Sequence, residues 1–190
     1  MHFFSTFFLL CTLIFALAGA DNIARKLESD SRFSMLREGL NTSPEVLNAL
    51  RDEKKTFTLF APTNEAIEKS KIENPNLSEF MQGPCGRQIL TYMIAGHIIP
   101  SRILFSHQIP IGHLTVDNLA GETVTITNNG VGDIRVETTG DSKSPSSHVV
   151  LPFDVKARNG VIHAIDRVLV PPGLVRSEIP SNCFVSKKHA

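Results

Sequence analysis

The side chains that could do chemistry in this sequence are histidines, acids and cysteines, several of them inside apolar runs. His97 stands within the apolar run 94–99, while His163 and Asp166 interrupt the apolar segment 161–170. Buried polar groups in native proteins almost always have hydrogen-bond partners. We therefore predict structural roles for these three residues, with Asp166 or a backbone carbonyl as the partner of His97.

No arrangement of residues predicts catalysis. The sequence contains no G-x-S-x-G nucleophile motif, no G-x-x-x-x-G-K-[ST] phosphate loop and no H-E-x-x-H zinc motif. His107 and His113 lack cysteine or carboxylate neighbours at the spacing of a zinc site. Cys85 and His97 lack a third group that would orient a thiol and base pair. We predict that the chain is not an enzyme and has no metal or cofactor site.

Length and charge set the broad class. The chain has 190 residues, enough for one domain, and 42% of them are hydrophobic. Its 19 basic and 19 acidic residues give a formal net charge of zero. This balance predicts no broad electrostatic attraction to nucleic acid or to anionic membranes.

The first twenty residues have the composition of a secretory leader. Residues 1–20 contain no charged side chain, centre on the apolar run 7–17 and end in Ala18-Gly19-Ala20, which fits the A-x-A cleavage pattern. We predict a signal peptide over 1–20 and Asp21 as the mature N-terminus. The alternative is an uncleaved signal anchor, because about 20 apolar residues can span a bilayer.

Cysteines and sequons fit passage through the secretory route. After cleavage the chain keeps Cys85 and Cys183, which could pair in a compartment where disulfides persist; the alternative is two unrelated thiols. The sequons Asn41-Thr42-Ser43 and Asn76-Leu77-Ser78 lie in polar stretches that we interpret as turns. We predict glycosylation at Asn41 and Asn76.

Hydrophobic periodicity changes from helical to alternating along the chain. Apolar spacing and capping residues predict helices over 23–40, from 44, over 64–69 with Thr63 as N-cap, and over 89–94. Alternating or β-branched runs predict strands at 56–60, 124–127, 134–136, 149–151 and 161–170. Asn159-Gly160 predicts a turn that leads into the last of these strands. Helices first, strands later and a single core indicate the α+β class.

Two long segments resemble the signature sequences of fasciclin domains. These are Phe57 to Ala66 (FTLFAPTNEA) and Asn159 to Pro171 (NGVIHAIDRVLVP). Between them, residues 97–102 resemble the family's central histidine segment, and Asp154-Val155 resembles an aspartate element that precedes the second signature.

The resemblance covers residues 22–172 and implies a fasciclin-like α+β domain over 21–172, followed by a polar tail over 173–190. In such a domain N-terminal helices pack on a mostly antiparallel β wedge. We expect Asp154 and Asn159, like His97, His163 and Asp166, to serve the fold.

The resemblance also implies a function. It predicts a non-catalytic adhesion or binding module, secreted or lumenal, that associates with the cell surface, matrix or wall through a protein or glycan partner. In this family a tyrosine usually precedes the central histidine, and that pair has been linked to integrin-type adhesion. Here Gly96 precedes His97 and the nearest tyrosine is Tyr92. The tyrosine-histidine pair therefore does not carry over.

A second hypothesis places the protein in an internal membrane system. It would be a resident of the endoplasmic reticulum, nuclear envelope or vacuole with a cell-specific developmental role, held by an uncleaved N-terminal anchor. The last residues, Lys187-Lys188-His189-Ala190, match a dilysine retrieval pattern that is recognised only in the cytosol. Arg25 and Lys26 after the apolar segment favour that orientation. If the leader is cleaved, we predict no membrane span.

Overall fold

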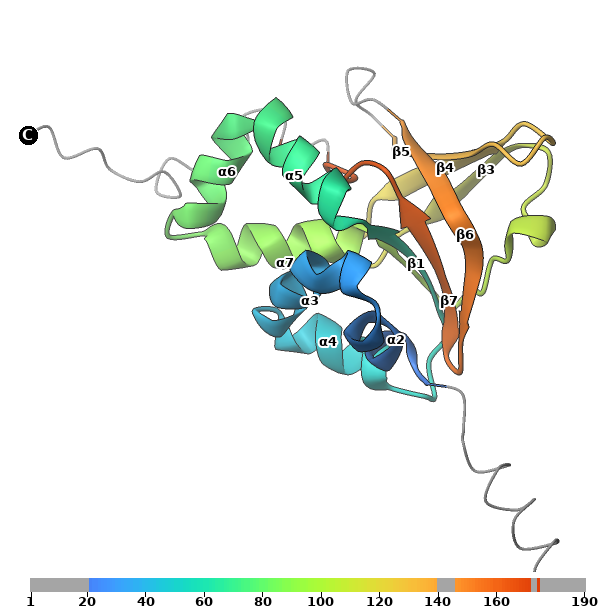
Figure 1. Ribbon diagram of the computed structural model, residues 1–190, viewed down its shortest axis with the longest axis horizontal. Coiled ribbons are helices and arrows are strands. Elements are labelled where there is room, and N and C mark those ends of the chain that lie inside the picture. The colour runs from blue at the N-terminus through green and yellow to red at the C-terminus, as the bar shows by residue number, and fades with distance from the viewer. Residues whose placement is uncertain (1–20, 140–145, 172–173, 175–190) are drawn as a thin grey trace, which may run out of the picture.

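Helices from the first half of the chain pack on a bent sheet formed mainly by the second half (Figure 1). The computed structural model describes residues 21–139, 146–171 and 174. The helical elements are α2 (Ile23–Ser29), η1 (Ser31–Phe33), α3 (Ser34–Asn41), α4 (Pro44–Arg51), α5 (Asn64–Glu73), α6 (Pro75–Gln82), α7 (Gly86–Gly96) and η2 (Ser106–Gln108). The strands are β1 (Phe57–Pro62), β2 (Ile98–Pro100), β3 (Gly112–Asp117), β4 (Thr123–Asn128), β5 (Ile134–Thr138), β6 (Ser147–Ala157) and β7 (Gly160–Ile165).

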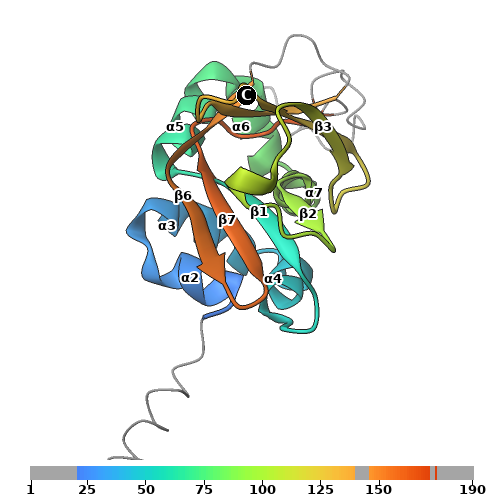
Figure 2. The same cartoon turned by 90° about the vertical axis from the view of Figure 1, so that its right-hand side faces the viewer.

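The strands form one sheet in the order β2-β1-β7-β6-β5-β4-β3. Among these strands only β1 and β7 pair in parallel, and the other neighbouring strands are antiparallel. Figure 2 turns the β3 end of the sheet toward the viewer, and β6, β7 and β1 run diagonally side by side below it. The predicted α+β class with a mostly antiparallel β wedge is confirmed.

Strand β6 bends the sheet because its pairing with β7 is interrupted. The register shifts between Val150 and Val155, and Asp154 within this bulge has a positive φ of 55°. Bulges bend the strand that carries them and increase its local twist. One part of β6 therefore pairs with β7 and another part with β5, so the sheet curls into a wedge.

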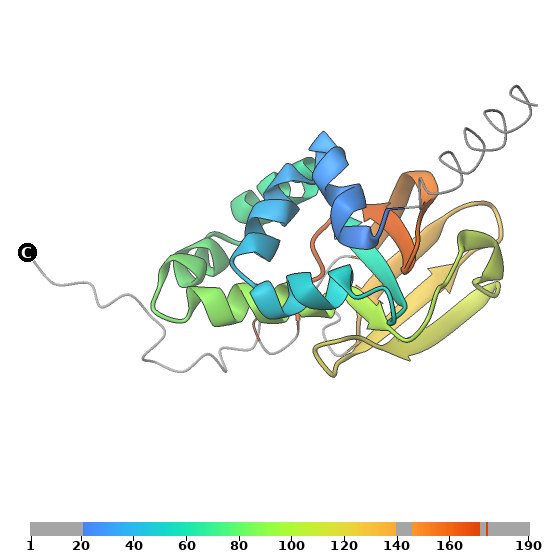
Figure 3. The same ribbon diagram turned by 90° about the horizontal axis from the view of Figure 1, so that it is seen from below.

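Two apolar clusters fill the two sides of the sheet. The first lies between the helices and the strands β1 and β7, and it includes Leu27, Phe33 and Ile162. The second lies inside the β wedge and includes Phe60 and Ile165. Figure 3 shows the same separation from below, with the helices on one side and the outer strands on the other.

The two signature segments are neighbouring buried strands, as the apolar runs predict. Strand β1 pairs with β7 in parallel from Phe57 and Gly160 to Pro62 and Ile165, and all residues of both strands are buried. Strand β7 ends at Ile165 and not at 170 as predicted. We attribute the early end of β7 to its partner strand, because β1 stops at Pro62 and α5 begins at Asn64.

The helix predictions hold in outline and differ in detail. Thr63 caps α5 as predicted, since its hydroxyl accepts a hydrogen bond from the Ala66 N–H at 3.2 Å. Ser43 precedes α4, but its hydroxyl bonds to the Thr91 hydroxyl at 2.7 Å instead of capping the helix. The stretch around Asn76, interpreted as a turn, is helix α6. No helix in the described part of the chain is long and apolar enough to cross a bilayer.

Candidate functional site

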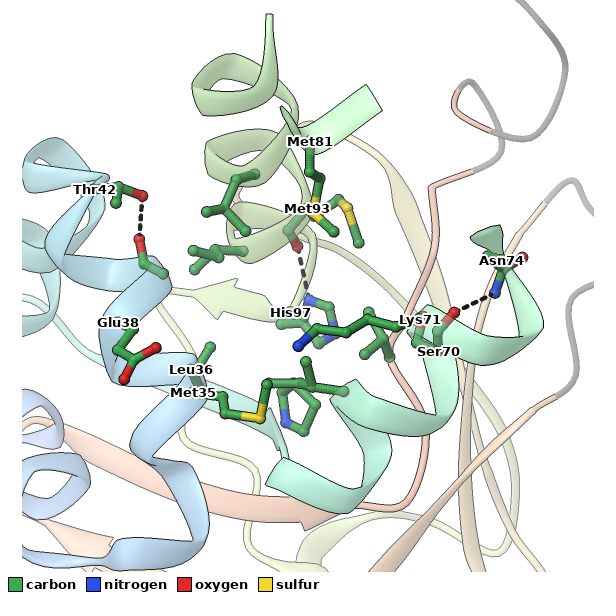
Figure 4. Close-up of a pocket in the computed structure, with 16 residues that line it drawn as sticks. Met35, Leu36, Glu38, Thr42, Ser70, Lys71, Asn74, Met81, Met93 and His97 are labelled. Carbon is green, nitrogen blue, oxygen red and sulfur yellow. Dashed lines mark hydrogen bonds between the residues drawn. The ribbon is translucent and has the colours of Figure 1, made fainter. Parts of the chain in front are cut away.

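An apolar groove lies between helices of the first half of the chain. Its walls come from α3, α5 and α7, and its volume is about 330 Å³ (Figure 4). Among the lining residues are Met35, Gly39, Ile67, Ser70, Leu90 and Met93, with Pro62 and Val168 from the sheet side. Volumes of this size are typical of sites that take a small molecule or a few anchoring side chains.

Small and flexible side chains shape this groove. A Cβ atom at Gly39 would lie 3.3 Å from the Ile94 Cδ1 atom, so glycine allows α3 to approach α7 closely. Three methionines, Met35, Met81 and Met93, line the groove, and their unbranched thioethers adapt to different apolar surfaces. The groove is therefore suited to an apolar anchor and not to a rigid polar ligand.

Two charged residues line the groove mouth. Lys71 is paired with Glu68 on its own helix, at 3.0 Å between Nζ and Oε1. Glu38 is exposed, and the described residues place no cationic group within ion-pair distance of it. The mouth therefore carries one carboxylate without a counter-ion beside an apolar floor.

His97 lies beneath the groove with only 2% of its surface exposed. Its Nε2 atom accepts a hydrogen bond from the Leu169 N–H at 2.9 Å, so the ring proton resides on Nδ1, which donates to the Met93 carbonyl at 2.7 Å. Burial lowers the pKa of His97 to about 4. Both ring nitrogens are occupied and the ring is neutral at pH 7, so His97 has no free atom for catalysis or metal binding.

The partner of His97 is a backbone carbonyl, one of the two candidates named from the sequence. The other candidate, Asp166, accepts a hydrogen bond from the His148 N–H at 2.7 Å and so links β7 to β6. Tyr92 does not replace the family's tyrosine beside the histidine. Its hydroxyl donates to Glu122 Oε1 at 2.5 Å, and burial together with this bond raises the pKa of Tyr92 to about 12.

A second polar cluster forms at the bulge of β6. The Asp154 carboxylate accepts hydrogen bonds from the N–H and the hydroxyl of Ser106, both at 2.7 Å. Burial by itself raises the pKa of Asp154, but the two bonds from Ser106 outweigh it and the pKa lies below its usual value. These bonds tie the loop before β3 to the bulge and stabilise the left-handed backbone at Asp154.

His163 completes this cluster from β7. The ring is fully buried and stacks on Phe60 with centroids 5.5 Å apart, and its Nε2 atom bonds to the Leu104 carbonyl at 2.8 Å. Its Nδ1 atom is 3.8 Å from Asp154 Oδ1, beyond hydrogen-bond distance. Burial lowers the pKa of His163.

The serine, aspartate and histidine of this cluster do not form a nucleophile and base pair. The Ser106 hydroxyl donates to the carboxylate, and the Leu104 carbonyl occupies the imidazole Nε2 atom. A catalytic serine needs a base within hydrogen-bond reach of its hydroxyl, which this geometry does not provide. The cluster fastens the loop and two strands together.

Asn159 joins three segments at the start of β7. Its side-chain oxygen accepts from the Ile23 N–H at 2.9 Å, and its amide nitrogen donates to the carbonyls of Leu50 at 2.8 Å and Asp52 at 3.2 Å. The next residue must be glycine, because a Cβ at Gly160 would lie 2.0 Å from the Phe57 carbonyl oxygen. The Asn-Gly pair therefore fixes the helices to the central strands.

The remaining predicted sites lie on the helical side or outside the described residues. Asn41 is exposed at the last residue of α3, and Asn76 is within α6. Cys85 precedes α7 and packs against Ile89 and Met93, while Cys183 lies outside the described residues. Within the described residues, no cluster of three or more His, Cys, Asp or Glu side chains is placed to hold a metal.

Sequence reasoning missed the groove, because its lining comes from residues that are far apart in the chain. The methionines 35, 81 and 93 carry no chemical signature, and α6, which contributes Met81, was interpreted as a turn. The one available signal was Gly39 in the middle of an amphipathic helix, where glycine costs stability unless close packing requires it.

Comparison with known proteins agrees with the fold and the signatures. The chain is 31% identical over 147 residues to fasciclin-like arabinogalactan protein 17 of Arabidopsis thaliana, an alignment that covers 75% of this chain and 29% of that protein. It is 32% identical over 152 residues to transforming growth factor-beta-induced protein ig-h3 of Oryctolagus cuniculus, covering 80% of this chain and 20% of the relative. The chain thus spans less than a third of these two relatives.

A solved structure shows the same fold. The structure of a FAS1 domain pair from the insect cell adhesion molecule Fasciclin I aligns with a TM-score of 0.67 at 18% identity, over 80% of this chain and 51% of that one. Residues 31–171 match the sequence profile of the fasciclin domain. The chain therefore belongs to the fasciclin domain family.

Proposed function

We propose that this protein is a non-catalytic, extracellular adhesion module that holds a protein partner in the groove between α3, α5 and α7. The groove is the observation that carries the proposal, because it joins an apolar floor to an unpaired carboxylate, Glu38. Interface anchors are usually apolar side chains that fill such pockets, with polar contacts around the rim. The fitting partner segment presents a leucine, methionine or phenylalanine next to a lysine or arginine.

The family membership supports the adhesive part of the proposal. One structural relative is named as an insect cell adhesion molecule, and other relatives are an arabinogalactan protein and periostin of Homo sapiens. The polar clusters support the non-catalytic part, since the buried imidazoles of His97 and His163 both bond to backbone carbonyls. The membrane-resident alternative depends on residues 1–20, outside the described part of the chain, and no relative named above favours it.

A secreted chain also fits the three processing predictions. We propose that residues 1–20 are removed, that Asn41 or Asn76 carries a glycan, and that Cys85 pairs with Cys183. Exposure of Asn41 supports the glycan, because a glycan needs an accessible asparagine.

An attachment assay tests the proposal. Plates are coated with the purified mature protein, and attachment of cells from the source organism is counted. Ser70→Phe fills the groove from α5, whereas Lys69→Phe places the same ring on the exposed side of that helix. We expect at least tenfold weaker attachment with Ser70→Phe and unchanged attachment with Lys69→Phe.

Two controls separate the parts of the proposal. Thermal unfolding of both variants checks that each is folded at the assay temperature. If wild-type coats hold no more cells than albumin coats, the adhesive function is wrong. If the wild type holds cells and Ser70→Phe holds them equally well, adhesion stands but the groove is not the contact site.

A further inference from the structure

The two edges of the sheet differ in how they are protected. Strand β2 is short, with Ile98 and Ile99 buried, and it ends at Pro100. Strand β3, at the other edge, spans Gly112 to Asp117 in an unbroken register with β4. Proteins normally protect long edges with proline, lysine, a bulge or a covering segment, because an open edge pairs with other strands.

In the described part of the molecule, β3 lacks proline, lysine and any bulge, and the segment nearest its free edge is β2, whose Ile98 carbonyl accepts from the Leu119 N–H just after β3. The sequence of β3 is GHLTVD. None of the backbone hydrogen bonds described for β3 reaches a segment other than β4. Alternate residues of an edge strand direct their N–H and C=O groups away from the sheet. Figure 2 turns this edge toward the viewer at the margin of the molecule.

The exposed face of β3 carries a symmetric row of side chains. His113, Thr115 and Asp117 alternate along the strand, so they share one face, and all three are exposed. The His113 Nδ1 atom lies 2.9 Å from the Thr127 hydroxyl, and Asp117 accepts from the Thr123 hydroxyl at 3.3 Å. An imidazole and a carboxylate are therefore oriented at equal distances on either side of Thr115.

We propose that β3 pairs antiparallel with β3 of a second copy of this chain, about a two-fold axis between the two Thr115 residues. This axis places His113 of each copy directly opposite Asp117 of the other. The dimer therefore contains two His113–Asp117 pairs, one at each end of the strand pair. A self-complementary patch of this kind is what a two-fold interface requires. The Nε2 side of His113 faces the carboxylate, because Nδ1 is bonded to Thr127.

The order of the imidazole and carboxylate side chains also selects the register. An axis at His113 would place imidazole against imidazole, and an axis at Asp117 would place carboxylate against carboxylate. Carboxylates directly opposite each other repel and destabilise a strand pair, and neither of these two axes places an imidazole opposite a carboxylate. An axis at Leu114 would pair Thr115 with His113, and an axis at Val116 would pair Thr115 with Asp117. Only the axis at Thr115 pairs both.

The association joins two sheets through one strand pair, which is a small interface. Interfaces below about 1,200 Å² are typical of weak or transient contacts. We therefore expect a concentration-dependent equilibrium between monomer and dimer. The proposed dimer uses a different surface from the groove, so its test is independent of the proposed adhesive function.

Sedimentation equilibrium of the mature protein up to millimolar concentration measures the association. His113→Asp places two carboxylates opposite each other at both ends of the pair, and we expect the dimer dissociation constant to rise at least tenfold. The double variant His113→Asp/Asp117→His restores the complementary pairs with the same residue types exchanged. We expect it to dimerise within threefold of wild type.

Cross-linking tests the geometry. Opposed residues of an antiparallel pair have Cβ atoms about 4.5–5.5 Å apart, so Thr115→Cys should form a disulfide-linked dimer under mild oxidation. Thr125 lies opposite Thr115 on β4, on the same face. In the proposed dimer two Thr125 residues would be three strand spacings apart, about 14 Å, so Thr125→Cys should not cross-link.

Three results would overturn the proposal. They are a wild-type protein that stays monomeric at millimolar concentration, an exchanged double variant that fails to restore a dimer lost in His113→Asp, and equal cross-linking of Thr115→Cys and Thr125→Cys. Circular dichroism and thermal unfolding of each monomer show that the variants are folded, so a lost dimer reports the edge and not misfolding.

Discussion

The Nε2 atom of His97 accepts a hydrogen bond from the backbone N–H of Leu169, 72 residues later in the chain, at 2.9 Å. Through its Nδ1 atom the same ring holds the Met93 carbonyl on α7. His97 therefore connects the last turn of α7 to the segment that follows β7. The family's central histidine therefore links two segments of the chain beneath the groove and is not an exposed contact.

His97→Ala should destabilise the domain. The substitution leaves the Leu169 N–H and the Met93 carbonyl without their partner, and each unsatisfied buried group costs about 1 to 3 kcal/mol. We expect a loss of about 2 to 4 kcal/mol, measured by urea unfolding followed by circular dichroism. His107→Ala, at an exposed histidine, is the control and should change stability by less than about 0.5 kcal/mol. Equal stability of the two variants would contradict the fastening role.

Lowering the pH should destabilise the domain already at pH values above the range in which carboxylates titrate. Burial lowers the pKa of His97 to about 4 in the folded protein, whereas an unfolded histidine has a pKa of about 6.5. Between these values the unfolded state binds more protons, so stability falls as the pH falls, by up to about 1.4 kcal/mol per pH unit for this group. The lowered pKa of His163 acts in the same direction.

Urea midpoints at pH 7.5, 6.0 and 5.0 measure this dependence. His97→Gln should reduce the slope, since glutamine keeps a donor and an acceptor but does not titrate in this range. A wild-type midpoint that is constant from pH 7.5 to 5.0 would show that neither buried histidine resists protonation.

Much of the fold was predictable because each of the two buried strands is a continuous run of apolar or β-branched residues. The β-branched and aromatic run at 57–60 and the apolar run at 161–165 predict buried strands, and the structure pairs them. The end of β7 was not predictable from its own residues. The apolar pattern continues to Val170, but pairing stops because the partner strand stops at Pro62.

The polar residues show the same limit. The sequence indicates that His97 and Asn159 need partners, yet the partners of Asn159 are backbone groups at Ile23, Leu50 and Asp52. Any residue supplies such groups, so no sequence pattern marks them. No sequence pattern marks the groove either, because it is the space that the packed helices leave between them.

Asn159→Asp tests the junction between the helices and the central strands. The carboxylate keeps an acceptor for the Ile23 N–H but loses both donors and faces the Leu50 carbonyl instead. Because the site is 1% exposed, we expect a loss of about 3 kcal/mol or more. Asn48→Asp on the exposed face of α4 makes the same chemical change and should cost less than about 0.5 kcal/mol. A similar small effect at Asn159 would refute its joining role.

Processing of the chain should be visible in its mass. Expressed in full through a eukaryotic secretory pathway, the protein should begin at Asp21 and carry a glycan that peptide N-glycosidase removes. Asn41→Gln should abolish or reduce this glycan, because Asn41 is the exposed sequon residue at the end of α3. A non-reducing peptide map should recover Cys85 and Cys183 in one linked fragment, which separates on reduction. An intact chain that begins at Met1, carries no glycan and exposes its C-terminus to protease outside sealed microsomes would instead establish the membrane-resident orientation.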